Sequence, residues 1–216
     1  MITLGVLPGD GIGPEVVAAA VRVTEAAVGD VTWCELPIGA SAIDTHGTPL
    51  PESTLAQLEH LDGWLLGPHD NASYPAGFPA PGGMIRKRFD LFANIRPARA
   101  LGVPAACPGM DLVIVRENTE GFYADRNMYA GSGEFMPTPD VALAVAVFTR
   151  RACERIAHEA FRLAARRRRS VTIAHKANVL TMTTGLFRDV CLEVGRGYPD
   201  IAVRTEHVDA LAALLV

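Results

Sequence analysis

Lys176 is the residue that could most readily do acid–base chemistry, because it follows an apolar run, Val171 to Ala174, and His175. The run predicts a short buried strand. Lysine is rarely buried without a partner, and removal from water lowers its pKa, so a lysine at the end of such a strand could act as a base near neutral pH. The alternative is a lysine that extends its amine into solvent at the edge of the sheet.

Three arginines could bind the carboxylates of a small acid. Arg86 is expected on a short helix, whereas Arg96 and Arg116 end strand-like runs, and Pro97 favours an extended backbone at Arg96. The planar guanidinium matches a carboxylate, so the three side chains could hold a di- or tricarboxylic acid. Three unrelated surface ion pairs are the alternative. Tyr123 follows soon after Arg116 and is either a core aromatic or an acid at the same site.

The elements that must position these residues alternate between strands and helices. Strands are predicted at 2–7, 31–36 and 64–66, and a helix is predicted to begin at Pro14. Proline suits the first turn of a helix, and the alternation indicates an α/β sheet with parallel strands. A glycine- and proline-rich loop is expected at 67–83.

The segment PGDGIGPE, at 8–15, joins the first strand to the first helix. A strand, a glycine-rich turn and a helix could hold a phosphate. The spacing G-x-G-x-G differs from the dinucleotide fingerprint, however, and no P-loop lysine follows. The segment alone is therefore weak support for a nucleotide, and a structural turn is the alternative.

Two later segments complete the predicted architecture. Residues 124–139 contain glycine, proline and aromatic residues and predict an extended arm or hairpin. Residues 149–166 predict an amphipathic helix. Its expected apolar stripe consists of Cys153, Ile156, Ala157, Ala160, Phe161 and Ala164.

Composition excludes several classes of protein. Hydrophobic residues make up 49% and charged residues 20%, as in a well-packed globule. The net charge of -4 argues against a protein that binds nucleic acid through phosphate contacts. The four cysteines are far apart and form no C-x-x-C, which fits a reducing compartment and gives no zinc signature. No signal peptide or membrane-spanning run is predicted, so we expect a cytoplasmic protein without membrane partners.

Together these motifs resemble the β-decarboxylating dehydrogenases, the family of isocitrate, isopropylmalate and tartrate dehydrogenases. The resemblance rests on PGDGIGPE, RKRFDLFANIRPAR, DLVIVRENTEGFYA, HKANV and the late VDA at 208–210, which occur in the family order. It implies a two-domain fold with mixed sheets, like that of isopropylmalate dehydrogenase and not a Rossmann fold. Residues 1–98 would begin the large, cofactor-side domain, and 99–216 would form the small domain with a dimerisation arm at about 124–139.

The resemblance also implies roles. The family oxidises a 2-hydroxy acid with NAD or NADP and then removes a neighbouring carboxylate. Lys176 and Tyr123 match its proton-handling residues, and Asp209 matches an aspartate that binds Mg²⁺ or Mn²⁺. The substrate carboxylates would be held by Arg86, Arg96 and Arg116. A homodimer with shared active sites is implied as well.

Two departures limit what the resemblance implies. The sequence ends at Val216 within an apolar run, before the family's other metal-binding aspartates and main cofactor loops, so the fold is expected to be incomplete at its C-terminus. No cofactor-binding residue is therefore assigned, and we expect the 216-residue chain alone to be inactive. A non-catalytic partner subunit is the alternative.

The second departure concerns the substrate. Residues 80–85 supply neither the serine and asparagine typical of isocitrate enzymes nor the leucines typical of isopropylmalate enzymes. Within the resemblance, Glu120 favours the isocitrate and tartrate branches, and His175 favours the isocitrate branch. We therefore expect an isocitrate- or tartrate/malate-like acid, with 3-isopropylmalate as the alternative.

Overall fold

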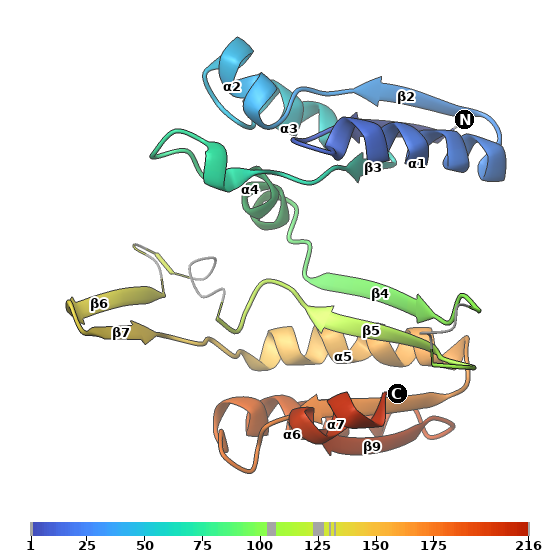
Figure 1. Ribbon diagram of the computed structural model, residues 1–216. Helices are drawn as coiled ribbons and strands as arrows, with labels where there is room; N and C mark the ends of the chain where they lie inside the picture. Colours follow the sequence, from blue (N-terminus) through green and yellow to red (C-terminus); the bar gives the residue numbers. More distant parts are fainter. Residues whose placement is uncertain (1, 103–106, 123–127, 130, 132, 216) are drawn as a thin grey trace. The chain divides into compact units, whose positions relative to one another are not determined.

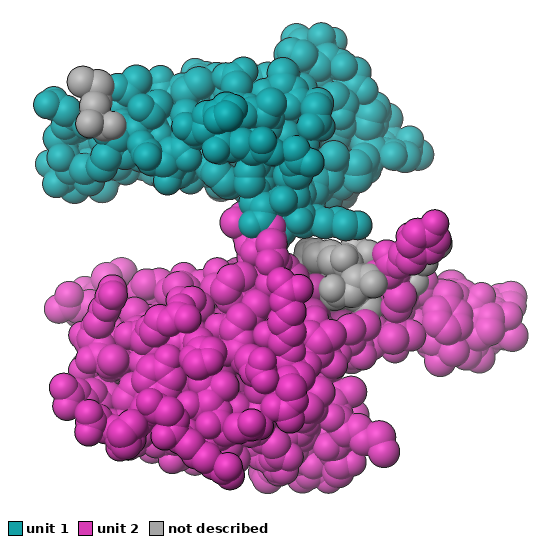
Figure 2. Space-filling view, turned by 180° about the vertical axis from the view of Figure 1, so that it is seen from behind, with its two compact units in different colours: residues 1–89 teal, residues 90–216 magenta. Residues whose placement is uncertain are grey.

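The computed structural model describes all residues except 1, 103–106, 123–127, 130, 132 and 216. The chain divides into two compact units, residues 1–89 and residues 90–216 (Figure 2). This division lies earlier than the boundary expected near Ala98, because the strand that contains Ala98 pairs with a strand of the second unit. The assignment of the units to a cofactor-side and a small domain stays a prediction. In the described part of the chain, no helix is long and apolar enough to cross a membrane.

Unit 1 is built on a parallel three-stranded sheet in the order β2-β1-β3 (Figure 1). The strands are β1 (Ile2–Leu7), β2 (Val31–Glu35) and β3 (Gly63–Leu66), as the sequence predicted. The helices are α1 (Gly13–Val28), α2 (Ala40–His46), α3 (Glu52–Leu58) and α4 (Pro81–Arg88), with a 3-10 turn, η1, at Asn71–Ser73. The expected loop at 67–83 therefore contains η1 and the start of α4.

The core of unit 1 lies where β1 ends and the chain turns into its helices. It is formed by Leu7, Leu36, Ile38, Leu50, Leu55, Leu58 and Ile85. Ile85, on α4, is fully buried there. Because neighbouring helix residues point in different directions, this anchor fixes the direction in which Arg86 leaves α4.

Close backbone contacts require glycine at two positions of the turn after β1. Gly9 has φ +76°, and a Cβ on it would lie 2.1 Å from the carbonyl oxygen of Pro68. A Cβ on Gly13 would lie 2.2 Å from the carbonyl oxygen of Pro8. Side chains at these positions would clash with backbone, so the structural interpretation of both glycines is confirmed.

Unit 2 combines parallel and antiparallel pairs of strands, so the expected mixture of sheets is present. β4 (Ala93–Arg99) and β5 (Asp111–Glu117) are antiparallel, and so are β6 (Glu134–Thr138) and β7 (Val141–Ala144). β8 (Ser170–His175) and β9 (Ala202–His207) are parallel. The helices are α5 (Arg150–Ala165), α6 (Thr183–Gly195) and α7 (Val208–Leu214).

The core of unit 2 surrounds α5. Its buried members are Ala157, Phe161, Ala164, Ile173, Cys191 and Ile201. Five of the six residues expected in the apolar stripe of α5 are buried, and Ala160 is half-buried. Thr149 caps the helix, because its side chain accepts a hydrogen bond from the amide of Ala152.

Candidate active site

Lys176 and Asp209 form an ion pair just beyond the ends of two paired strands. β8 and β9 are parallel, and His175 pairs with His207 at their carboxyl ends. Lys176 is the next residue after β8, and Asp209 lies in the first turn of α7, after β9. The Nζ of Lys176 lies 2.7 Å from Oδ1 of Asp209. Lys176 therefore has a partner in this structure, and both residues lie where ligands of α/β sheets are commonly bound.

Lys176 stabilises the negatively charged form of Asp209. The hydrogen bond from Lys176 holds the pKa of the Asp209 carboxyl below its ordinary value. The Lys176 side chain is about one-third exposed. The strand end before it is fixed by His175, which is buried and whose Nδ1 accepts a hydrogen bond from the amide of Ala177 at 3.1 Å.

Asp209 fits the expected role in metal binding in part. A carboxylate oxygen is a ligand that Mg²⁺ and Mn²⁺ prefer. Among the residues that the structure describes, however, no group of three or more histidine, cysteine or acidic side chains could hold a metal ion. Asp209 could supply one ligand of a cation site, and these residues do not complete the site.

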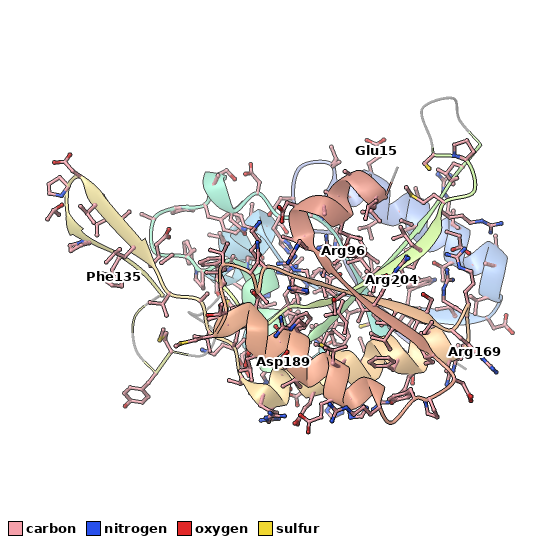
Figure 3. The ribbon with its side chains drawn as sticks, turned by 90° about the horizontal axis from the view of Figure 1, so that it is seen from below. Glu15, Arg96, Phe135, Arg169, Asp189 and Arg204 are labelled. Carbon is pink, nitrogen blue, oxygen red and sulfur yellow. The ribbon has the colours of Figure 1, made fainter. Side chains whose placement is uncertain are left out.

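Arg96 and Arg116 share one face of the β4–β5 ladder. Arg116 pairs with Asn94, and paired residues point to the same side of a sheet. Arg96 is two residues after Asn94 on β4, so it points to that side as well. Its Nε donates a hydrogen bond to Oδ1 of Asn94 at 3.0 Å. Figure 3 labels Arg96 on this strand. The ladder thus brings together two of the three arginines expected to hold the substrate.

The opposite face of this ladder is covered by α5. Glu117 alternates with Arg116 and points the other way, toward Arg155 of α5. Nη2 of Arg155 lies 3.4 Å from Oε1 of Glu117 and donates to Oγ1 of Thr119 at 2.8 Å. Nη1 of Arg155 donates to Asp90 at 2.7 Å, and its guanidinium lies over the ring of Phe92. This contact fixes the end of β5, from which Arg116 projects.

The turn that follows Arg116 is held by two carboxylates. Glu117 accepts hydrogen bonds from the amides of Thr119 and Glu120, at 2.7 and 2.6 Å. The carboxylate of Glu120 in turn accepts from the amide and hydroxyl of Thr149, at 2.8 and 2.6 Å. Tyr123 comes next along the chain and lies outside the described residues, so its expected role as a proton donor stays a prediction.

Arg86 belongs to unit 1, in which Asp10 connects several segments of the chain. The carboxylate of Asp10 accepts hydrogen bonds from the amide of Ala40 at 2.7 Å, the amide of Asp70 at 3.1 Å and the hydroxyl of Tyr74. Burial would raise the pKa of Asp10, but these hydrogen bonds outweigh it and hold the pKa below its ordinary value. Asp10 therefore connects the glycine-rich turn with the segment that leads into α4.

Three of these residues were not assigned a role by sequence reasoning: Asp10, Glu117 and Arg155. Asp10 lies within the motif PGDGIGPE and Glu117 within RENTEGFY, but neither residue was given a role of its own. Asp10 was marked only by its charge between two glycines, whereas Glu117 stands among charged and polar neighbours and gave no distinct signal. Arg155 lies on the helix opposite the predicted apolar stripe and gave no signal.

Comparisons with known proteins identify the family. The family described as isocitrate/isopropylmalate dehydrogenase matches residues 3–216. The chain belongs to this family, as its motifs implied. It is 41% identical to a 3-isopropylmalate dehydrogenase of Archaeoglobus fulgidus, over 98% of this chain and 61% of that relative. It is also 41% identical to an isocitrate/homoisocitrate dehydrogenase of Thermus thermophilus, over 97% of this chain and 61% of that relative.

The fold agrees with this family. The crystal structure of isocitrate dehydrogenase from Methylococcus capsulatus matches with a TM-score of 0.85 and 38% sequence identity. The match covers 100% of this chain and 63% of that one. The expected isopropylmalate-dehydrogenase-like α/β fold is confirmed, and the chain spans about three-fifths of the length of the curated relatives it matches.

Proposed function

We propose that the native protein catalyses the metal-dependent oxidative decarboxylation of a 2-hydroxy di- or tricarboxylic acid with NAD or NADP. The observation that carries this proposal is the ion pair of Lys176 and Asp209, 2.7 Å apart, in a chain of the isocitrate/isopropylmalate dehydrogenase family. A base beside a carboxylate that could bind a hard cation is the combination needed to ionise a hydroxyl.

The residues of this chain would divide the work as follows. Arg96 and Arg116 hold substrate carboxylates, because they point to one side of the β4–β5 ladder. Lys176 would first leave Asp209 and give the proton of its ammonium group to solvent, and the neutral amine would then take the hydroxyl proton. Tyr123 returns a proton to the carbon that loses the carboxylate. NAD(P) would accept the hydride, and a Mg²⁺ or Mn²⁺ ion held in part by Asp209 would stabilise negative charge on oxygen.

The acid is proposed to be isocitrate- or tartrate/malate-like. The first turn of α4 carries Gly82 and Gly83, which offer no apolar surface for an isopropyl group. 3-Isopropylmalate remains the second candidate, because the relative from Archaeoglobus fulgidus bears that name.

The protein is further proposed to work as a cytoplasmic homodimer. β6 and β7 form a two-stranded hairpin (Figure 1). Every residue of both strands is exposed, including Phe135 at 50% and Met136 at 63%. A two-stranded ribbon is marginally stable by itself, and its exposed apolar side chains favour a protein partner. The four cysteines are free, which suits a reducing compartment.

The test is an assay of the complete native protein with Mg²⁺ or Mn²⁺, NAD and NADP, and a panel of isocitrate, tartrate, malate and 3-isopropylmalate. Lys176→Met should lower kcat about 10²- to 10⁴-fold, the range for loss of a general base. Lys87→Met is the matched control, since Lys87 is the only other lysine and is exposed. Full activity of Lys176→Met, or no turnover of any of these acids by the native protein, would contradict the proposal. The second result would favour a non-catalytic subunit.

A further inference from the structure

The backbone of Lys176 is held by hydrogen bonds at its amide and at its carbonyl. The amide donates to Oγ1 of Thr184, near the start of α6, at 3.3 Å. The hydroxyl of Thr184 in turn donates to the carbonyl of Leu180 at 3.0 Å, which leaves the lone pairs of its oxygen to accept. The carbonyl of Lys176 accepts from the amides of Val179 and Leu180, at 3.1 and 2.9 Å. Lys176 therefore has a fixed place in the turn that joins β8 to α6.

His175 holds the same turn from the side of β8. Its Nδ1 accepts a hydrogen bond from the amide of Ala177, two residues farther along the chain, at 3.1 Å. Asparagine and aspartate make the same contact in an Asx turn, where the side chain bonds to the backbone two residues on. The bond spans Lys176, which lies between the two residues that it joins. Since Nδ1 accepts, the proton of a neutral ring is on Nε2.

The surroundings of the His175 ring favour this acceptor role. The residue is buried, at 7% exposure. Burial lowers the pKa of His175, and the charge of His207 lowers it further. The ring is therefore neutral near pH 7, and Nδ1 keeps the lone pair that accepts from the backbone.

His175 also touches the strand that leads to Asp209. It pairs with His207, the last residue of β9, and the two rings meet edge to face with their centroids 5.1 Å apart. Asp209 follows two residues after His207, and its carboxylate lies 2.7 Å from Nζ of Lys176. One buried ring thus contacts both segments from which this ion pair projects.

The position of the Lys176 backbone matters because lysine carries its amine on a long, flexible stem. A general base must lie within hydrogen-bond reach of the proton that it takes, and a displacement of about 1 Å can lower a rate about 10²-fold. A shift of the turn after β8 would move the amine away from the substrate hydroxyl. It would leave the arginines of the β4–β5 ladder where they are.

We infer that His175 and Thr184 are positioning residues, which hold the turn around Lys176 so that its amine reaches the hydroxyl of the bound acid. His175 acts through Nδ1 on the backbone that follows Lys176, and Thr184 acts through its hydroxyl on the amide of Lys176 itself. This inference rests on the proposed function. It extends that function because it assigns part of the rate to two side chains that neither bind the acid nor exchange a proton with it.

The experiment compares His175→Phe with His175→Asn in the complete native protein. Activity is measured with Mg²⁺, with NAD or NADP, and with whichever of isocitrate, tartrate, malate and 3-isopropylmalate is turned over fastest. Phenylalanine keeps a ring but removes the acceptor, so kcat should fall about 10- to 100-fold while KM for the acid changes little. Asparagine can accept from the amide two residues on and should recover most of kcat. His60→Phe should keep kcat, because His60 is exposed in unit 1.

A second pair of variants tests the other hydrogen bond. Thr184→Val removes the hydroxyl that accepts from the amide of Lys176 and should lower kcat, whereas Thr184→Ser keeps the hydroxyl and should retain it. Calorimetry without cofactor should give the same affinity for the acid in all of these variants, because the acid is held by other residues.

A double variant separates positioning from general support of the fold. If His175 acts through Lys176, His175→Phe should cause no further loss of kcat in Lys176→Met. A purely structural role would add its own loss to that of Lys176→Met. Amide hydrogen exchange at Ala177 should be faster in His175→Phe than in His175→Asn, since only the asparagine variant keeps an acceptor for that amide.

The outcomes separate this inference from the proposed function. If the unaltered protein turns over an acid and His175→Phe keeps its kcat, the inference is overturned and the proposed function stands. The inference is also overturned if His175→Asn loses as much activity as His175→Phe, or if the losses add in the double variant. If the unaltered protein turns over none of the acids, the proposed function fails and the inference fails with it. Thermal unfolding shows whether each variant is folded, and if His175→Phe is not, the two Thr184 variants decide by the same criteria.

Discussion

The guanidinium of Arg155 on α5 lies 3.4 Å from the carboxylate of Glu117, the last residue of β5. Both side chains are mostly buried, at 21% and 15% exposure. Arg116 is adjacent to Glu117 and points to the opposite side of the strand. A contact on the helix side of the ladder therefore controls the end of the strand that carries a proposed substrate-binding arginine.

Arg155→Ala should destabilise unit 2 by about 2–4 kcal/mol, because removal of one partner of a mostly buried ion pair leaves the other charge uncompensated. Arg155→Lys should recover only part of this loss, since lysine lacks the planar fork that reaches both Glu117 and Asp90. Amide hydrogen exchange across residues 150–165 measures the change. Arg151→Ala is the control, because Arg151 is exposed on the same helix.

Tryptophan fluorescence reports on unit 1 alone, so it can be compared with hydrogen exchange in unit 2. Trp33 and Trp64 are the only tryptophans, and both lie in unit 1. Tryptophan fluorescence should therefore be the same in Arg155→Ala and in the unaltered protein. Equal exchange rates in α5 of the two proteins would show that the ion pair contributes no net stability.

Ile85 connects the core of unit 1 to Arg86, so Ile85→Ala should affect both stability and binding. The side chain is fully buried, and its truncation should cost about 2–4 kcal/mol of unfolding free energy. Trp64 packs against the same core, so its fluorescence during urea unfolding reports the loss. Val23→Ala, at an exposed position on α1, should change stability by no more than about 0.5 kcal/mol. A loss in Ile85→Ala as small as that of the control would contradict the proposed anchoring.

Local patterns in the sequence predicted the elements, but not the contacts that join them. Strands with continuous apolar runs and the stripe of α5 were identified correctly, because their periodicity is local. Asp10 was missed as an organising residue since its partners Ala40, Asp70 and Tyr74 are 30, 60 and 64 positions away. Arg155 and Glu117 are likewise 38 residues apart. Such pairings depend on the tertiary fold.

The site residues show the same difference between what the local sequence predicts and what only the tertiary fold shows. Lys176 was recognised because a lysine after a buried strand is unusual, and its partner Asp209 was known only through the family resemblance. That Arg96 and Arg116 share one face of the ladder could be known only from the register of β4 and β5, in which Asn94 lies opposite Arg116. The start of α4 was missed because glycines and prolines dominate residues 67–83, although Pro81 at its first turn is a recognisable signal.

The Asp10–Tyr74 hydrogen bond should appear in the titration of Asp10. Burial would raise the pKa of Asp10, but the pKa lies below its ordinary value in the folded state, and the hydrogen bond from Tyr74 is the largest cause of that lowering. A carboxyl with a depressed pKa contributes stability above its unfolded pKa and loses it as the pH falls through the folded pKa. Tyr74→Phe should therefore raise the pKa of Asp10 and move the acid unfolding of unit 1 to higher pH. Carboxyl ¹³C NMR measures the first effect, and an unshifted Asp10 resonance would contradict it.

Phe135 and Leu143 lie opposite each other on β6 and β7, and both are about half exposed, at 50% and 46%. Figure 3 labels Phe135 on this hairpin. If the hairpin is the dimer contact, Phe135→Ser with Leu143→Ser should weaken the dimer at least about tenfold, because each removes apolar surface from both copies. Sedimentation equilibrium of the complete protein measures the dissociation constant. Val23→Ser, which alters an exposed apolar side chain of unit 1, should leave it unchanged. If the double variant keeps the dissociation constant of the unaltered dimer, the dimer must associate through another surface. If the unaltered protein is a monomer, the hairpin is not a dimer contact.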